Sequence, residues 1–409
     1  MKKNRVQTIR RSINRIRLPL LALAFILTGK SPVVNEARAL GFRIPNQDAE
    51  ATARGNAFVA TADNPSALYY NPAGITQLEG TRAQFGSHNI SVNSEFNSTT
   101  PGVGSKTSFE IQPVPQLYVT HTPEGKPYSF GLGVYAPFGL GLEWPENGPL
   151  RPFALEGRLM YVTISPIAAW KILPNLSVAL GPTFNYSTLM LRQGAGIPGG
   201  EFRFEGDGFC AGGKAGILWQ PAPKWSVGAT YFSPTSVRYR GNSSFKPLAA
   251  DTPTTTEGDF PQFLVAGISY RPTTNWNFEV GVDWTDWDTL DTLIFEGTPF
   301  GNVPFGLNWK SSWLVHSGVS RYLDNGYWVA AGYFYSENST TDANFSPLVP
   351  DTNLHVVSLG VGHKGEKWDW ALSGQVIGGP KRHINNGGGM DGTYQFFNQA
   401  INISVAYRF

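Results

Sequence analysis

The histidines come first in a search for chemistry, because an imidazole can act as an acid, a base or a metal ligand near neutral pH. The six histidines are scattered along the chain, at His88, His121, His316, His355, His363 and His383. None lies in a recognisable nucleophile or metal-binding motif. Glycine pairs such as Gly131 and Gly133 fall inside alternating apolar segments, where no nucleotide-binding loop is expected. The sequence therefore predicts neither an enzyme nor a bound metal or cofactor.

Two segments place charged residues opposite an apolar face. In 307–322 the odd positions are apolar (Leu307, Trp309, Trp313, Val315 and Val319), which puts Lys310 and His316 on the other face. In 275–290 the even positions are apolar, so Glu279 and Asp283 point the other way. Lys310 can pair with the carboxylate of a ligand, or inside the protein with one of these acids. We take Lys310 and His316 as candidate ligand-binding residues, with the internal ion pair as the alternative.

Amphipathic strands are the elements that must position these side chains. Only 15% of the residues are charged, and beyond residue 39 no run of about 18 apolar residues offers a transmembrane helix. Short connections alternate with longer polar ones, such as 242–257, 338–352 and 380–395, as is typical of outer-membrane β-barrels. We expect an all-β, antiparallel transmembrane barrel of fourteen strands, at 81–93, 109–121, 128–143, 157–171, 175–192, 201–220, 224–240, 260–271, 275–290, 307–322, 327–337, 353–363, 367–379 and 396–409.

The last segment carries the clearest alternation. Every second residue from Ile401 to Phe409 is apolar or aromatic, and the residues between them are mostly polar. A final strand ending in phenylalanine resembles the signal read by the bacterial barrel-assembly machinery, so we expect Phe409 to contact that machinery. Six aromatic residues follow short turns and are expected to form the periplasmic aromatic girdle at the level of the lipid headgroups, namely Tyr128, Trp225, Trp276, Tyr327, Trp328 and Trp368.

The first 39 residues have the features of a secretory signal peptide. A basic stretch precedes the apolar run 18–27, and Ala37-Arg38-Ala39 has the small-x-small spacing of a cleavage site. Removing residues 1–39 would leave 23 basic and 29 acidic residues. A net-acidic chain without a basic cluster is not expected to bind nucleic acid.

Residues 40–80 lack the alternation of the strands. They are rich in small residues, have helical spacing between Ala49 and Ala60, and contain the helix breakers Pro65 and Pro72. The segment is too short for a separate domain, whereas a barrel of fourteen strands has a lumen too wide for side chains alone to fill. We therefore expect residues 40–80 to form a small hatch with short helices that plugs a barrel over 81–409.

This segment resembles the FadL/TodX family of outer-membrane transporters for long-chain fatty acids and hydrocarbons. The likeness rests on Gly41-Phe42, Gly55-Asn56-Ala57, Ala62-Asp63 and Asn71-Pro72-Ala73-Gly74, and it extends loosely to 130–140 and 182–186. The resemblance implies passive uptake of a long-chain fatty acid or hydrocarbon, without a cofactor, and lateral release into the membrane. It also implies that Leu40, Gly41 and Phe42 contact the ligand and move to release it, and that Asn71, Pro72 and Ala73 anchor the hatch to the wall.

The third expected strand, 128–143, contains residues that weaken pairing. Pro137 has no N–H to donate, and nearby glycines, Gly133 and Gly139 among them, remove side chains around it. We expect a kink over Gly133, Pro137, Phe138 and Gly139. The resemblance implies that ligand leaves the barrel there; a bulge without a role is the alternative.

Two other functions stay open on the sequence. One is a channel for aromatic or alkane hydrocarbons with the same architecture, because a ligand without a carboxylate would not need Lys310. The other is a surface-interaction barrel whose long loops serve adhesion or phage binding, for which the hatch would be dispensable. We expect a monomer.

Overall fold

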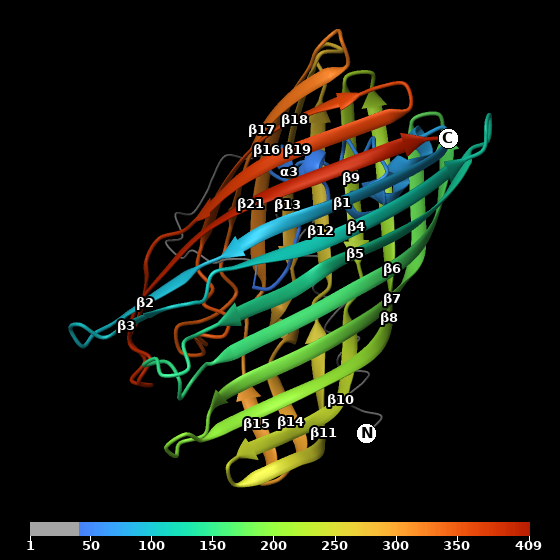
Figure 1. Cartoon of the computed structure of the whole chain (residues 1–409). Coiled ribbons are helices and arrows are strands. Elements are labelled where there is room, and N and C mark those ends of the chain that lie inside the picture. Colours follow the sequence, from blue (N-terminus) through green and yellow to red (C-terminus); the bar gives the residue numbers. More distant parts are fainter. Residues whose placement is uncertain (1–40) are drawn as a thin grey trace, which may run out of the picture. The chain divides into compact units, whose positions relative to one another are not determined.

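The computed structural model describes residues 41–409, so Leu40 and the predicted signal peptide lie outside the described residues. Fourteen strands, four of them interrupted, form a closed antiparallel barrel (Figure 1). In chain order they are β1 (Gly80–Val92), β4 (Glu110–Thr122), β5 (Tyr128–Glu143), β6 (Glu156–Leu173), β7 (Leu176–Gly194), β8 (Glu201–Ala222), β9 with β10 (Trp225–Phe232 and Thr235–Lys246), β11 with β12 (Ala249–Phe260 and Phe263–Tyr270), β13 with β14 (Trp276–Thr285 and Thr292–Thr298), β15 with β16 (Gly301–Gly306 and Ser312–Tyr322), β17 (Tyr327–Ser336), β18 (Leu354–Lys364), β19 (Trp368–Gly378) and β21 (Gly392–Arg408).

The barrel closes where β1 pairs with β21. Their register runs from Arg82 opposite Arg408 to Ser91 opposite Gln399. Short strands β2 (Ser94–Ser98), β3 (Gly104–Lys106) and β20 (Arg382–Ile384) extend the sheet at the end that carries the long connections. We call this the outer end, since outer-membrane barrels carry short turns on the periplasmic side.

No helix among residues 41–409 is both long and apolar enough to span a membrane.

Three sequence-based expectations fail near the ends of the strands. Segment 242–257, expected to be a loop, instead continues β10 and β11 into a hairpin. Leu307 and Trp309, expected to face lipid, lie between β15 and β16 and are buried, because this irregular segment turns into the lumen. Trp328 is buried as well, since its neighbour Tyr327 faces outward and successive strand residues point to opposite faces.

The hatch consists of α3 (Ala49–Ala53), α4 (Ala67–Tyr70) and the 3-10 helix η1 (Pro72–Gln77), and it is almost entirely buried. Asp48 caps α3 by accepting a hydrogen bond from the N–H of Ala51, and Asn71 caps η1 in the same way. Figure 1 shows α3 behind the strands of the front wall. These short helices are stabilised by packing inside the barrel, since helices of this length are marginal in isolation.

Small residues and ion pairs join the hatch to the wall. A Cβ atom on Gly332 of β17 would lie 2.0 Å from the carbonyl carbon of Arg54, so only glycine lets the two backbones approach there. Near the periplasmic end, Lys364 contacts Glu50 at 2.9 Å and Arg271 contacts Asp63 at 3.0 Å. The hatch is therefore held on several sides of the lumen.

Candidate functional site

The wall has an opening between β4 and β5. β1 and β4 pair along their whole length, from Gly80–Thr122 to Val92–Glu110. β4 and β5, in contrast, pair only from His121–Phe130 to Leu117–Val134. Beyond Leu117 towards the outer end, the facing edges of these two strands form no ladder. On its other side β5 continues to pair with β6, with a register shift between Tyr135 and Phe138.

Prolines on both edges explain why this ladder stops. Pro113 and Pro115 lie two residues apart in β4, so their missing N–H groups face the same side of the strand. The β1 side is fully paired, which leaves the β5 side without these two donors. Pro137 in β5 lies within the register shift. Pro137 was among the residues predicted from the sequence and Pro113 and Pro115 were not, although two prolines in alternate positions of a strand are a recognisable sign of an unpaired edge.

The start of the hatch covers the free edge of β5 from within. The N–H of Ile44 donates to the carbonyl of Pro137 at 2.8 Å, and the N–H of Gly139 donates to the carbonyl of Phe42 at 2.9 Å. Arg43 and Phe138 are thereby paired as an isolated antiparallel bridge. Residues 42–44, here called the tip, therefore take part of the place that β4 leaves vacant.

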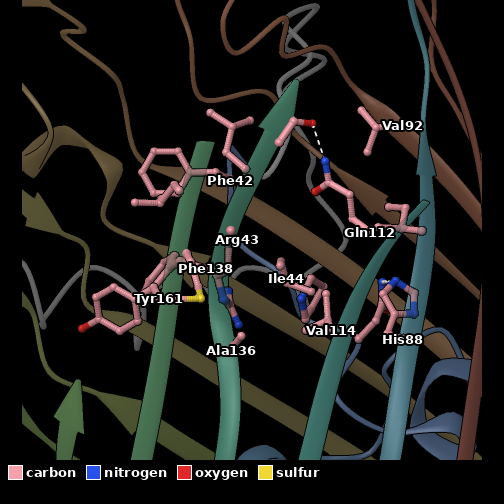
Figure 2. Close-up of a pocket in the computed structure, with 18 of the residues that line it drawn as sticks. Phe42, Arg43, Ile44, His88, Val92, Gln112, Val114, Ala136, Phe138 and Tyr161 are labelled. Carbon is pink, nitrogen blue, oxygen red and sulfur yellow. Dashed lines mark hydrogen bonds between the residues drawn. The ribbon is translucent and has the colours of Figure 1, made fainter. Parts of the chain in front are cut away.

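The tip borders a cavity of about 490 Å³ that reaches the outside of the barrel. Figure 2 shows Phe42, Arg43 and Ile44 beside Phe138, with Val114 and Gln112 on the strand across the opening. The cavity is also lined by Phe85 and Met160, of which 60% and 44% are exposed on the outer face of the wall. Because its lining includes lumen residues and outward-facing residues, the cavity joins the lumen to the lipid-facing surface at the opening.

Phe42 lies in a cage of aromatic rings. Its ring centroid is 4.8 Å from that of Trp287 and 5.2 Å from that of Trp309, and Phe138 and Phe260 lie at 6.1 and 6.0 Å. A second, apolar cavity of about 70 Å³ on the outer side is lined by Phe42 as well. The Phe42 ring thus lies between the two cavities. Of the two tryptophans in its cage, Trp309 was expected to face lipid, and Trp287 was not among the residues predicted from the sequence.

The lumen acids of β13 pair with arginines of the hatch, where the sequence suggested Lys310 as their partner. Arg43 Nη1 lies 2.5 Å from Asp283, and the guanidinium stacks 3.7 Å from the ring centroid of Phe263. Arg54 lies 3.5 Å from Glu279. The charges beneath the large cavity are therefore neutralised within the protein.

The loop between β17 and β18 adds one titratable group to the cavity lining. Burial raises the pKa of Asp351 to about 6, while the N–H of Ser339 and the charge of Arg382 act in the opposite direction. The N–H of Ser339 donates to this carboxylate at 2.7 Å. The carboxyl group of Asp351 therefore changes its charge at mildly acidic pH.

Lys310 and His316 lie away from the large cavity. Lys310 precedes β16, and its backbone N–H donates to the carbonyl of Ser339 at 2.9 Å; its side chain lines neither of the apolar cavities. His316 faces the lumen, as its place in the alternation predicts, but it lines a separate pocket of about 20 Å³ with Arg43 and Asp283. The structure therefore brings Gly41 and Phe42 together with Phe138 and Gly139, and leaves Lys310 and His316 outside.

Asn71 and Pro72 contact the wall at β8, and Ala73 follows them in the buried helix η1. The amide of Asn71 donates to the carbonyl of Ile217 at 2.9 Å and to that of Val59 at 2.8 Å. A Cβ atom on Gly216 would lie 2.5 Å from the Asn71 side chain, so this strand offers a recess for it. Lys214 on the same strand donates to the carbonyls of Leu68 and Tyr69. This end of the hatch is tied to the wall through main-chain carbonyls.

Replacing Asn71 with alanine is expected to loosen this end of the hatch. Two buried carbonyls would lose their donor, which costs about 1–3 kcal/mol and should speed hydrogen exchange of the hatch amides about tenfold or more. The measurement is hydrogen exchange over residues 57–78 in detergent. The control Asn97→Ala changes an exposed side chain at the outer end. Unaltered exchange in Asn71→Ala would contradict the anchoring role.

A closed barrel that is filled by its own N-terminal segment, with an apolar cavity that reaches its lipid-facing surface, has the architecture of an outer-membrane channel. Residues 31–372 match the family described as outer membrane protein transport protein (OMPP1/FadL/TodX). The chain belongs to this family of outer-membrane transporters.

Individual relatives agree with this assignment. Outer membrane protein P1 of Haemophilus influenzae is 22% identical over 406 residues, which cover 84% of this chain and 86% of that protein. Among solved structures, a Pseudomonas aeruginosa FadL homologue matches with a TM-score of 0.81 at 16% identity, covering 90% of this chain and all of that one. The toluene transporter TbuX of Ralstonia pickettii matches with a TM-score of 0.71 at 16% identity, over 92% and 100% of the two chains. At these identities the structural matches show a shared fold and nothing further.

Proposed function

We propose that this protein takes up long-chain fatty acids or similar hydrophobic compounds and releases them sideways through the opening between β4 and β5. The observation that carries the proposal is the 490 Å³ cavity, whose lining runs from Phe42 in the lumen to Phe85 and Met160 on the outer face. Lateral release keeps an apolar ligand out of water, and each buried CH₂ is worth about 0.8 kcal/mol.

The path we propose passes through two cavities. Ligand first enters the 70 Å³ cavity near the outer end, which is lined by Leu189, Leu293 and Phe305 among others. Movement of the tip then takes Phe42 out of its cage and joins this cavity to the larger one. The tip is held to β5 by two main-chain hydrogen bonds and to β13 by the buried pair of Arg43 with Asp283, so ligand binding must offset the contacts that this movement breaks.

A monoaromatic hydrocarbon is the second candidate ligand. Four aromatic rings surround that of Phe42, and such a cage favours a flat ring of similar size. The related protein TbuX is described as a toluene transporter. Uptake of labelled oleate and labelled toluene, in cells that carry or lack this protein, tests both ligands; the proposal of fatty-acid uptake is overturned if toluene alone enters.

The assembly partner of the barrel and its oligomeric state are also part of this proposal. We propose that Phe409 is read by the barrel-assembly machinery and that the barrel works as a monomer. The continuous pairing of β1 with β21 supports the latter, because it leaves no open strand edge at the seam where the first and last strands meet. An adhesion or phage-binding role would show as surface binding without ligand uptake in the same cells.

Phe42→Ala is expected to weaken binding of a fatty acid and of an alkane of equal length alike. The Phe42 ring lines both cavities, so its loss removes apolar surface against which either ligand is buried, and we expect about a tenfold loss of affinity for both. The measurement is a pair of titrations in detergent. Lys310→Ala is the comparison: because Lys310 lines neither cavity, affinity should change little. If Lys310→Ala lost affinity for the fatty acid but kept its affinity for the alkane, Lys310 would be a contact of the ligand headgroup after all.

A further inference from the structure

A glutamine crosses the opening in the wall near its outer end. Gln112 of β4 points inward, and its Nε2 donates to the carbonyl oxygen of Gly141 on β5 at 2.9 Å. Figure 2 shows this hydrogen bond as a dashed line from the side-chain nitrogen of Gln112. The two strands form no backbone ladder at this level, so the side chain replaces the missing main-chain pairing.

Gly141 is fitted to this contact. A Cβ atom there would lie 1.9 Å from Gln112 Nε2 and 2.5 Å from its Cδ, so any larger residue would push the amide away. Gly141 is not among the glycines with positive φ, so its backbone conformation gives no separate reason for glycine. The bridge thus depends on one residue from each edge of the opening.

Two further contacts close the wall beyond this bridge. The N–H of Ser108 donates to the carbonyl of Glu143 at 3.0 Å. Arg158 of β6 reaches over β5 and binds Glu110 of β4 through two hydrogen bonds, of 3.0 and 3.1 Å. A bidentate arginine–carboxylate pair is stronger than a neutral hydrogen bond. The Gln112 bridge is therefore the contact nearest to the opening on this side, and it is weaker than the Arg158–Glu110 pair beyond it.

The bridge limits the length of the opening. On the periplasmic side the last ladder pair is Leu117 with Val134. From Leu117 to Gln112 the strand covers five residues, roughly 17 Å, and loss of the bridge would extend the opening to Glu110, roughly 7 Å farther. The bridge is uncharged, so it closes this part of the wall without placing a charge against lipid.

We propose that the Gln112–Gly141 bridge is a specificity determinant that sets the largest rigid ligand able to leave through the wall. Flexible chains and single rings pass below the bridge, and broad fused-ring compounds are held back by it. The inference rests on the proposed lateral release and adds to it a residue that decides which ligands benefit.

The test compares a narrow and a broad ligand in cells carrying this protein. Uptake of radiolabelled hexadecanoate and of pyrene is measured for the unmodified chain, Gln112→Ala and Gly141→Ala. We expect both variants to raise the ratio of pyrene to hexadecanoate uptake about fivefold, the factor that one neutral hydrogen bond typically provides. Heat-modifiable migration on gels verifies that each barrel is folded.

Gln375→Ala is the matched control. Gln375 of β19 also bridges to a neighbouring strand, since its Nε2 donates to Ser358 Oγ of β18 at 2.8 Å, but there the ladder is continuous. Its uptake ratio should equal that of the unmodified chain. A closed variant, in which valine replaces Pro113, Pro115 and Pro137 so that β4 and β5 can pair, is measured beside them. An unchanged ratio in Gln112→Ala and Gly141→Ala overturns the inference if this closed variant fails to take up hexadecanoate. If the closed variant takes up both ligands, the proposed lateral release itself is wrong.

Discussion

Replacing Pro113, Pro115 and Pro137 together with valine is expected to abolish uptake of a long-chain fatty acid while leaving the barrel folded. Valine restores the N–H at each position, so β4 and β5 can pair past Leu117, where their ladder now stops. Three main-chain hydrogen bonds at about 1 kcal/mol each would lower the population of the open wall about 100-fold. The measurement is uptake by cells, together with ligand binding to the purified protein in detergent.

Binding in the 70 Å³ cavity should be retained in this triple variant, because the lining of that cavity includes no residue of β4. Pro182→Val is the matched control, since Pro182 lies in β7, which pairs with β8 along its length. Normal uptake by the triple variant, with closure of the ladder shown by hydrogen exchange, would exclude release through the β4–β5 opening.

Deleting residues 42–75 is expected to turn the protein into an open pore. The deleted segment contributes Arg43, Arg54 and the hatch helices, and a lumen of fourteen strands is too wide for wall side chains to fill. Planar-bilayer recordings should change from no resolved channel steps to stable open channels. Asp283 and Glu279 would then face water without their arginines, so the pore should favour cations.

A milder variant keeps this prediction independent of the deletion's folding. Arg54→Ala leaves the hatch in place but removes the partner of Glu279, and breaking a buried pair typically costs about 3–5 kcal/mol. We expect brief channel openings in this variant. Conductance like that of the unmodified chain in both the deletion and Arg54→Ala would show that something other than the hatch seals the lumen.

The architecture could be predicted from the sequence alone, because the pattern that indicates it is local. Alternation in segments such as 401–409 depends on which face of a strand meets lipid, so it can be read residue by residue. The hatch was recognisable because residues 40–80 lack that alternation, and the FadL/TodX resemblance lay in the same segment. Where a segment leaves the strand, as at Leu307 and Trp309, the alternation stops applying and the prediction failed.

Tertiary structure decided how the site is assembled. Arg43 and Asp283 pair although 240 residues separate them, and no local pattern indicates which lumen acid meets which hatch arginine. The two edges of the opening could be seen as proline-containing strands, but their coincidence depends on the register of β4 against β5. The same holds for the cage around Phe42, whose rings come from segments far apart along the chain. Periodicity reports the environment of each residue separately, whereas a cavity requires residues from distant segments at one depth in the barrel, and that depth is set by strand register and by how the hatch packs.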